Sequence, residues 1–177
     1  IRDAAYIVTT VRVGGDEARI RDERIALSQG VLGQETTGPG GFAMAMRTIP
    51  VARRFAELAD RVAPGAITFN FSNPAGLVTQ ALRDAGHSQV IGICDGANAA
   101  QANVARVLGV EPDDLRAEVF GLNHLSWSRK VLLDGTDVLQ PLLLDPASRA
   151  GTALALFEDE LIEMKQMGIN EYLYYYY

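Results

Sequence analysis

A strand, a helix and a second strand follow one another closely in the first half of the chain. Residues 66–71 (AITFNF) and residues 90–93 (VIGI) are short apolar runs that predict buried strands. Between them, a helical pattern begins at Pro74 and ends near Ala85. This order, with its short loops, predicts an α/β fold built on a parallel sheet with covering helices.

The second strand leads directly into a thiol and a carboxylate. Cys94, the only cysteine, and Asp95 follow residues 90–93, and a helical pattern begins at Ala97. Both side chains are expected at the carboxyl end of a parallel strand, the edge at which open α/β sheets bind ligands. A structural alternative is that Cys94 is a small buried apolar residue, as single cysteines at strand ends often are.

His124 lies 30 residues after Cys94, within the segment GLNHLSW at residues 121–127. A thiolate and an imidazole brought together from two segments can bind a metal and leave coordination positions for a substrate. The spacing leaves a second interpretation open, in which His124 is a hydrogen-bonded structural residue.

The segment before residue 66 supplies a strand, a charged helix and a glycine-rich loop. Residues 3–13 favour a strand, and the Gly14–Gly15 pair after it permits a tight turn or a close approach of the backbone to a ligand. Residues 16–27 predict a helix that carries Arg19, whose planar guanidinium suits a phosphate. The alternative is that this helix only presents a solvated charged face.

Three further elements are predicted from local composition. Residues 33–42 (GQETTGPGGF) predict a loop, and residues 42–62 predict a helix that Pro50 kinks or restarts. From residue 115 the pattern changes to α+β: residues 115–120 and 126–133 predict strands, and residues 152–167 predict a helix.

Composition limits the classes of partner. The formal net charge of −6 disfavours nucleic acid, and no apolar run approaches the length of a membrane span. No signal peptide is visible, and the single cysteine suits a reducing compartment. We therefore expect a cytoplasmic protein with neither a nucleic-acid nor a membrane partner. The sequence starts at Ile1 without a methionine, enters a predicted strand at once and ends in four tyrosines at residues 174–177, so we expect a fragment of a longer protein.

Six motifs occur in a fixed order over almost the whole length of the chain. They are RVGGDEAR, GQETTGPGGF, NFSNPAG, GICDG, GLNHLSW and NEYLYYYY. Each motif is weak alone, but the ordered set resembles the NAD-dependent family-4 glycoside hydrolases, most closely the 6-phospho-β-glucosidase branch. The resemblance implies a fold similar to that of lactate and malate dehydrogenases. Residues 1–95 would be the second half of a Rossmann-type NAD-binding domain, and residues 96–177 the truncated start of an α+β catalytic domain.

The resemblance also implies roles for individual residues. Cys94 and His124 match the two protein ligands of a divalent metal, expected to be Mn²⁺. Asp95 matches a proposed general acid, and Tyr172 is the best match to a tyrosine base, with Tyr175 and Tyr176 as alternatives. The positions matched to the substrate are Arg19, near its phosphate, Asn73 and Asn123. The positions matched to NAD are Val13, Gly14 and Asn70.

The reaction implied is hydrolysis of a phosphorylated disaccharide or glycoside. NAD would oxidise carbon 3 of the sugar, the metal would polarise the resulting ketone, and the tyrosine would remove the proton on carbon 2. The glycosidic oxygen would then leave, water would add, and the hydride would return.

Two features expected for the family are absent from the sequence. The glycine-rich phosphate loop would lie before Ile1, and an arginine expected to help bind phosphate would lie further downstream. We therefore expect this chain alone to bind NAD poorly and to be inactive, and the full-length protein to be a homo-oligomer, a dimer or a tetramer. Two other functions stay open: a 2-hydroxy-acid dehydrogenase of the same fold, which would need no metal, and a non-catalytic domain that binds a sugar phosphate.

Overall fold

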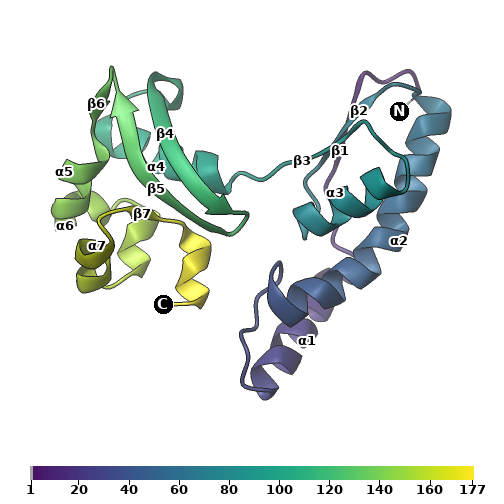
Figure 1. Cartoon of the computed structure of the whole chain (residues 1–177), viewed down its shortest axis with the longest axis horizontal. Helices are drawn as coiled ribbons and strands as arrows, with labels where there is room; N and C mark the ends of the chain where they lie inside the picture. Colours follow the sequence, from purple (N-terminus) through teal and green to yellow (C-terminus); the bar gives the residue numbers. More distant parts are fainter. Residues whose placement is uncertain (1) are drawn as a thin grey trace. The chain divides into compact units, whose positions relative to one another are not determined.

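The computed structural model describes residues 2–177, apart from the side chains of Ala97, Ala99 and Ala100. The chain forms two compact units, of which the first ends at Cys94 and the second begins at Asp95 (Figure 1). This division lies one residue from the predicted domain boundary. The assignment of the two units as an NAD-binding and a catalytic domain stays a prediction.

A three-stranded parallel sheet forms the centre of the first unit. Its strands are β1 (Tyr6–Thr9), β2 (Ile67–Asn70) and β3 (Val90–Gly92), in that order across the sheet. Thr9 pairs with Asn70, and Asn70 pairs with Gly92. The carboxyl ends of all three strands therefore meet at one edge, as the predicted strand–helix–strand order requires.

Three helices complete the first unit: α1 (Gly15–Ser28), α2 (Gly38–Val62) and α3 (Ala75–Asp84). Helices α2 and α3 connect successive parallel strands, so right-handed crossovers place both on the same face of the sheet. The core on this face is made of small and medium apolar residues: Ala52, Ala56, Val78, Leu82 and Val90.

The opposite face of this sheet presents apolar side chains to solvent. Tyr6 and Val8 of β1 are 67% and 62% exposed, and Ile91 of β3 is 46% exposed. Phe69 stands between Val8 and Ile91 in the register and has its ring centroid 6.2 Å from that of Tyr6. The sheet is thus covered by helices on one face only within the described residues.

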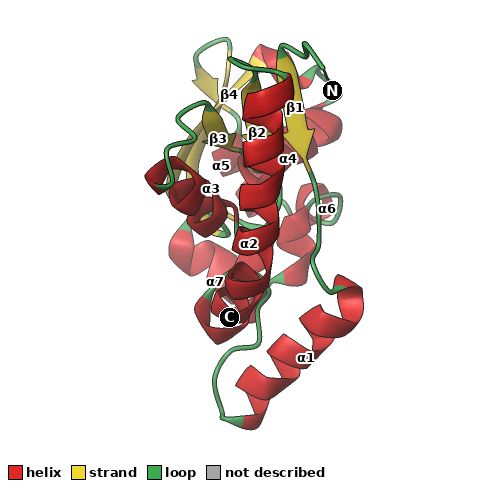
Figure 2. Cartoon of the chain, turned by 90° about the vertical axis from the view of Figure 1, so that its right-hand side faces the viewer, coloured by secondary structure: helices red, strands yellow, loops and turns green. Residues whose placement is uncertain are grey.

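Helix α2 bears on two predictions. It is one continuous helix (Figure 2) with Pro50 inside it, so the predicted restart at Pro50 is wrong, whereas the alternative, a kink at Pro50, stays a prediction. Ala45, Thr48 and Ala52 on either side of the proline are buried, and this packing outweighs the local preference for a break. The helix also begins at Gly38, inside the predicted loop. Glycine is required at Gly41 by close approach, since a Cβ atom there would lie 2.1 Å from the carbonyl oxygen of Thr36. The prediction that residues 33–42 are all loop was therefore wrong.

The second unit is built on an antiparallel sheet. Strand β4 (Leu115–Leu122) pairs with β5 (Leu125–Leu133), which also pairs with β6 (Thr136–Asp137) and β7 (Gly168–Ile169). The two predicted strands of this region are present. The helical elements around them are α4 (Gly96–Leu108), η1 (Pro112–Asp114), α5 (Leu139–Leu144), α6 (Pro146–Arg149), η2 (Ala153–Leu156), α7 (Asp159–Lys165) and η3 (Glu171–Tyr175).

The single helix predicted for residues 152–167 is wrong, because the segment divides into η2 and α7. Thr152 caps η2 by accepting a hydrogen bond from the backbone N–H of Leu154, and the backbone at Phe157 and Glu158 is extended. Leu154 and Phe157 remain buried, because an i, i+3 pair lies on one side of a 3₁₀ turn as well as of an α-helix.

Large apolar side chains form the core of the second unit. The buried residues include Leu139, Leu142, Phe157, Ile162 and Leu173. No helix among residues 2–177 combines the length and the apolar character needed to cross a lipid bilayer.

Candidate active site

The carboxyl edge of the parallel sheet is held by the side chain of Asn70, which is 1% exposed. Its Oδ1 accepts hydrogen bonds from the Thr9 hydroxyl (3.1 Å) and the Ser72 backbone N–H (3.2 Å). Its Nδ2 donates to the Ser72 carbonyl (3.2 Å) and the Thr79 hydroxyl (3.3 Å). Asn70 thus links β1, β2 and α3, and its predicted contact with NAD stays a prediction.

A buried carboxylate that the sequence analysis did not identify lies at the same edge. Glu35 is 5% exposed; its Oε2 accepts a hydrogen bond from Arg12 Nη1 at 2.5 Å, and its Oε1 accepts one from Asn73 Nδ2 at 3.4 Å. Glu35 therefore joins Arg12, after β1, to Asn73, after β2. The available signal was that Glu35 is the only charged residue in the segment GQETTGPGGF.

Asn73 was predicted to contact the substrate, and its contact with Glu35 restricts how it can do so. A carboxylate only accepts hydrogen bonds, so the donor end of the amide faces Glu35. The Oδ1 atom at the other end is then directed away from this pair and can accept from a ligand hydroxyl.

The Val13–Gly14 turn lies between β1 and α1. Gly14 has φ +87°, and a Cβ atom there would lie 2.6 Å from the Cβ atom of Ala18, so the turn requires glycine. Arg47 holds this turn: its Nε donates to the Val13 carbonyl at 3.5 Å, and its guanidinium forms a bidentate ion pair with the buried Asp22. Arg47 and Asp22 are a second pair that the sequence analysis did not identify.

Arg19, the predicted phosphate ligand, lies on α1 with its side chain 34% exposed. Its Nε donates to Glu23 Oε1 at 2.9 Å, one helical turn further along. A phosphate at Arg19 would therefore compete with, or add to, an existing ion pair, and the predicted role stays a prediction.

Cys94 and Asp95 follow the sheet edge as predicted. The Ile93 N–H donates to the Asn70 carbonyl at 3.0 Å, so the backbone remains attached to β2 up to the residue before the cysteine. Cys94 is half-buried, whereas Asp95 is exposed and precedes α4 as its N-cap residue.

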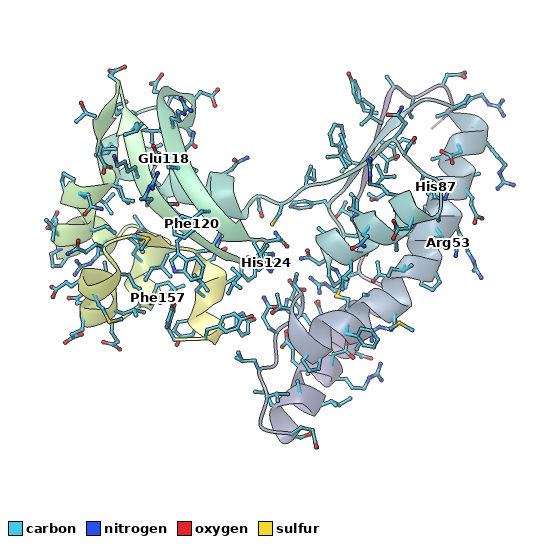
Figure 3. All side chains as sticks on the ribbon, in the orientation of Figure 1. Arg53, His87, Glu118, Phe120, His124 and Phe157 are labelled. Carbon is cyan, nitrogen blue, oxygen red and sulfur yellow. The ribbon has the colours of Figure 1, made fainter. Side chains whose placement is uncertain are left out.

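His124 lies at the tip of the β4–β5 hairpin, where Leu122 pairs with Leu125 and leaves Asn123 and His124 as the two turn residues (Figure 3). His124 has φ +59° and is 2% exposed, whereas Asn123 is exposed. The ring of His124 stacks on that of Tyr172 with a centroid separation of 3.5 Å and an interplanar angle of 7°. The structure therefore brings together the predicted metal ligand and the predicted base.

Cys94 and His124 belong to different units, so the predicted metal site stays a prediction. Their chemistry fits a divalent cation, because thiolate and imidazole are both metal ligands. The stacked arrangement also fits, because the lone pair of an imidazole nitrogen lies in the ring plane and Tyr172 covers only the ring face. No cluster of three or more His, Cys, Asp or Glu residues within positions 2–177 could bind a metal unaided.

The chain is similar to enzymes that act on phosphorylated sugars. It is 37% identical over 186 residues to a 6-phospho-beta-glucosidase of Escherichia coli, an alignment that covers 100% of this chain and 41% of the relative. It is 39% identical over 127 residues to 6-phospho-alpha-glucosidase 1 of Lacticaseibacillus paracasei, covering 71% of this chain and 29% of the relative. The chain thus spans less than half the length of these relatives.

Solved structures extend this similarity to the fold. The 6-phospho-beta glucosidase of Thermotoga maritima, solved with manganese, NAD⁺ and glucose-6-phosphate, superimposes with a TM-score of 0.82 at 31% identity, over 98% of this chain and 42% of that one. Lactate dehydrogenase of Eimeria maxima, at 14% identity, covers 99% of this chain with a TM-score of 0.57. The predicted Rossmann-type, lactate and malate dehydrogenase-like fold is confirmed.

A family profile decides the membership that the ordered motifs predicted. The profile described as "Family 4 glycosyl hydrolase" matches residues 1–110, which is more than half of the chain. This matched range contains the sheet edge, Glu35, the Val13–Gly14 turn and Cys94. The chain belongs to family 4 of the glycosyl hydrolases.

Proposed function

We propose that the intact protein hydrolyses 6-phosphoglycosides with the help of NAD and a divalent metal, Mn²⁺. Family membership supports the reaction class, and the Thermotoga maritima structure with manganese, NAD⁺ and glucose-6-phosphate supports the cofactors and the phosphorylated substrate. The observation that carries the proposal is the contact between His124 and Tyr172, a metal-binding residue type and a potential base side by side in the second unit.

Separate sets of residues would hold NAD and the metal in this proposal. Val13, Gly14 and Asn70 would contact NAD at the carboxyl edge of the sheet, where α/β folds of this kind bind dinucleotides. Cys94 and His124 would hold the metal. When bound, NAD supplies a reversible hydride acceptor and Mn²⁺ supplies a Lewis acid.

Three residues would bind the sugar phosphate. Arg19 would form charge-assisted hydrogen bonds with the phosphate oxygens. Asn73, whose amide nitrogen already donates to Glu35, would accept a hydrogen bond from a sugar hydroxyl through Oδ1. Asn123 is exposed at the hairpin tip and would contribute a further polar contact.

Two residues would move protons. Tyr172 would remove the proton on carbon 2 of the oxidised sugar, and Asp95 would protonate the departing glycosidic oxygen. A positioned acid or base of this kind contributes roughly 10²–10⁴-fold to a rate. The exposure of Asp95 suits exchange of its proton with solvent.

We also propose that the protein acts in the cytoplasm as a homo-oligomer, a dimer or a tetramer. The single cysteine supports a reducing compartment. Light scattering on the intact protein at several concentrations tests the oligomeric state, and a monomer throughout would contradict it.

The central test is hydrolysis of aryl 6-phospho-β- and 6-phospho-α-glucosides by the intact protein, each with and without NAD⁺ and Mn²⁺. Release of the aryl group should require both additions, and the corresponding unphosphorylated glycosides should react far more slowly. Hydrolysis without NAD⁺, or metal-independent oxidation of a 2-hydroxy acid, would contradict the proposal. The preferred anomer is read directly from the two substrates.

A second test concerns Arg19. In the intact protein, Arg19→Ala should raise KM for phosphorylated substrates at least tenfold, because it removes a charge-assisted contact, while KM for unphosphorylated substrates changes little. Arg21→Ala, an exposed arginine on the same helix, is the matched control and should leave both values unchanged. Equal effects of Arg19→Ala on both substrate classes would assign Arg19 a structural role.

A further inference from the structure

The stack between His124 and Tyr172 is unusually close. Its centroid separation of 3.5 Å and interplanar angle of 7° mean that the two rings overlap almost completely. Offset or edge-to-face aromatic pairs have centroids about 4.5–7 Å apart. In this arrangement the imidazole cannot rotate about its Cβ–Cγ bond without displacing the phenol ring.

The backbone of His124 is also restrained. The residue occupies the left-handed region at φ +59°, in a two-residue turn whose ends are fixed by the pairing of Leu122 with Leu125. With its side chain 2% exposed, His124 has little freedom besides the orientation of its ring. The ring orientation is the remaining variable, and the ring of Tyr172 lies against the imidazole face.

One buried residue fixes Tyr172 relative to the hairpin. Asn170 is 9% exposed and accepts a hydrogen bond from the Tyr172 N–H through Oδ1, at 3.0 Å. Its backbone N–H donates to the Ser126 carbonyl at 3.2 Å, and its Nδ2 donates to the Ser126 hydroxyl at 3.3 Å. Ser126 lies two residues after His124, so Asn170 sets the position of one ring relative to the other.

We infer that Tyr172 is a positioning residue for His124: its ring face fixes the plane of the imidazole so that a ring nitrogen is oriented for metal binding, and Asn170 fixes Tyr172. This inference rests on the proposed function, in which His124 is a metal ligand. Stacking restrains the ring without occupying the in-plane lone pair that a metal needs. Loss of a hydrogen-bonding partner that orients a ligating histidine typically costs about 10–100-fold in metal affinity, and we expect loss of the stacked ring to act in this range.

The positioning role and the proposed role as a base use different parts of the tyrosine. Positioning depends on the ring face, whereas proton removal depends on the hydroxyl oxygen. Phenylalanine retains the ring and lacks the hydroxyl, and leucine lacks both. The two substitutions therefore separate the two roles.

The experiment measures Mn²⁺ binding to the intact protein without substrate, from the electron paramagnetic resonance signal of free Mn²⁺. Tyr172→Phe should bind Mn²⁺ within about twofold of wild type, and Tyr172→Leu should bind at least tenfold more weakly. Tyr174→Leu, in the same 3₁₀ helix and 60% exposed, is the matched control and should bind like wild type. Wild-type affinity in Tyr172→Leu would overturn the inference.

Two further variants keep the outcomes distinct. Asn170→Ala retains both aromatic side chains but removes the hydrogen bonds that fix Tyr172 relative to the hairpin, and should weaken Mn²⁺ binding severalfold. If Tyr172→Leu does not fold, wild-type affinity in Asn170→Ala overturns the inference. His124→Ala should abolish site-specific binding. If His124→Ala binds Mn²⁺ like wild type, the metal site of the proposed function is wrong, whereas normal binding by Tyr172→Leu alone rejects only the positioning role.

Discussion

The two units stabilise their candidate site residues by different means. In the first unit, the sheet edge is held by polar contacts around Asn70 and by the buried carboxylates Glu35 and Asp22, over a core of small and medium apolar residues. In the second unit, His124 is held by an aromatic stack, and the core contains large side chains such as Phe157 and Leu173.

The difference follows from what each region is proposed to bind. A backbone turn at a sheet edge can approach a dinucleotide closely only if its residues are small. Small side chains offer little packing, so hydrogen bonds and ion pairs must fix these loops. A single imidazole at a hairpin tip needs restraint of one ring, and packing supplies it. The first unit should therefore be sensitive to lost charge, and the second to lost volume.

The largest expected effect comes from a volume change in the second unit. Leu173 is 1% exposed and follows Tyr172, so Leu173→Ala should lower the free energy of unfolding of this unit by about 2–5 kcal/mol. Urea unfolding followed by fluorescence of Trp127, the only tryptophan, reports this unit. Leu156→Ala, at a position 52% exposed, is the control, and an equal loss there would reject packing as the main restraint.

A smaller effect is expected from charge removal in the first unit. Glu35→Gln weakens a buried carboxylate's contacts with Arg12 and Asn73, which should cost about 1–3 kcal/mol and speed hydrogen exchange in β2. The control is an exposed ion pair in the second unit, in which the side chain of Glu118 is 36% exposed and that of Arg129 is 69% exposed. Glu118→Gln removes this pair and should lower the free energy of unfolding by at most about 1 kcal/mol. Similar costs for both variants would remove the contrast between buried and exposed charge.

The smallest effect concerns Asp145, the N-cap residue of α6 in the second unit. The hydrogen bond from the Ser148 hydroxyl, together with those from the backbone N–H groups of Ala147 and Ser148, lowers the pKa of Asp145 from its ordinary value of 3.8. A lowered carboxyl pKa stabilises the folded state above the unfolded pKa, and this contribution is lost as the pH falls through the folded pKa.

Asp145→Asn should therefore lower the free energy of unfolding slightly at neutral pH. The difference in this free energy between the variant and wild type should shrink as the pH falls below the ordinary pKa of a carboxyl group. Unfolding free energies of both proteins between neutral and acidic pH measure this. If the difference in unfolding free energy instead grows on acidification, the expected direction of the pH dependence is wrong. Charge would then matter more in the second unit than the contrast between the two units implies.

The sequence predicted the parts of the fold that depend on local periodicity. The parallel strands at Ile67–Asn70 and Val90–Gly92 and the hairpin strands β4 and β5 follow apolar runs bounded by turns. The sequence left open whether Pro50 restarts α2, and the helix does not restart there, because tertiary packing on both sides of the proline outweighs its local preference. The division of residues 152–167 was missed because a three-residue apolar spacing fits two helix types.

The sequence could name candidate site residues where motifs contain them, but it could not identify contacts that depend on long-range pairing. His124 and Tyr172 were singled out separately, yet their stack depends on the pairing of β7 with β5, which places Asn170 beside Ser126. Glu35 and Arg12 are 23 positions apart, and no periodicity relates a loop carboxylate to an arginine after a strand. Only the folded chain identifies such partners.

The uncovered face of the parallel sheet has a practical consequence for anyone preparing this polypeptide. Tyr6, Val8 and Ile91 form a solvent-facing apolar surface on strands whose other face is already packed. Such surfaces cause concentration-dependent self-association and poor recovery after purification. Tyr6→Thr combined with Val8→Thr keeps β-forming residues while making the surface polar, and should raise the soluble yield without altering the carboxyl edge of the sheet.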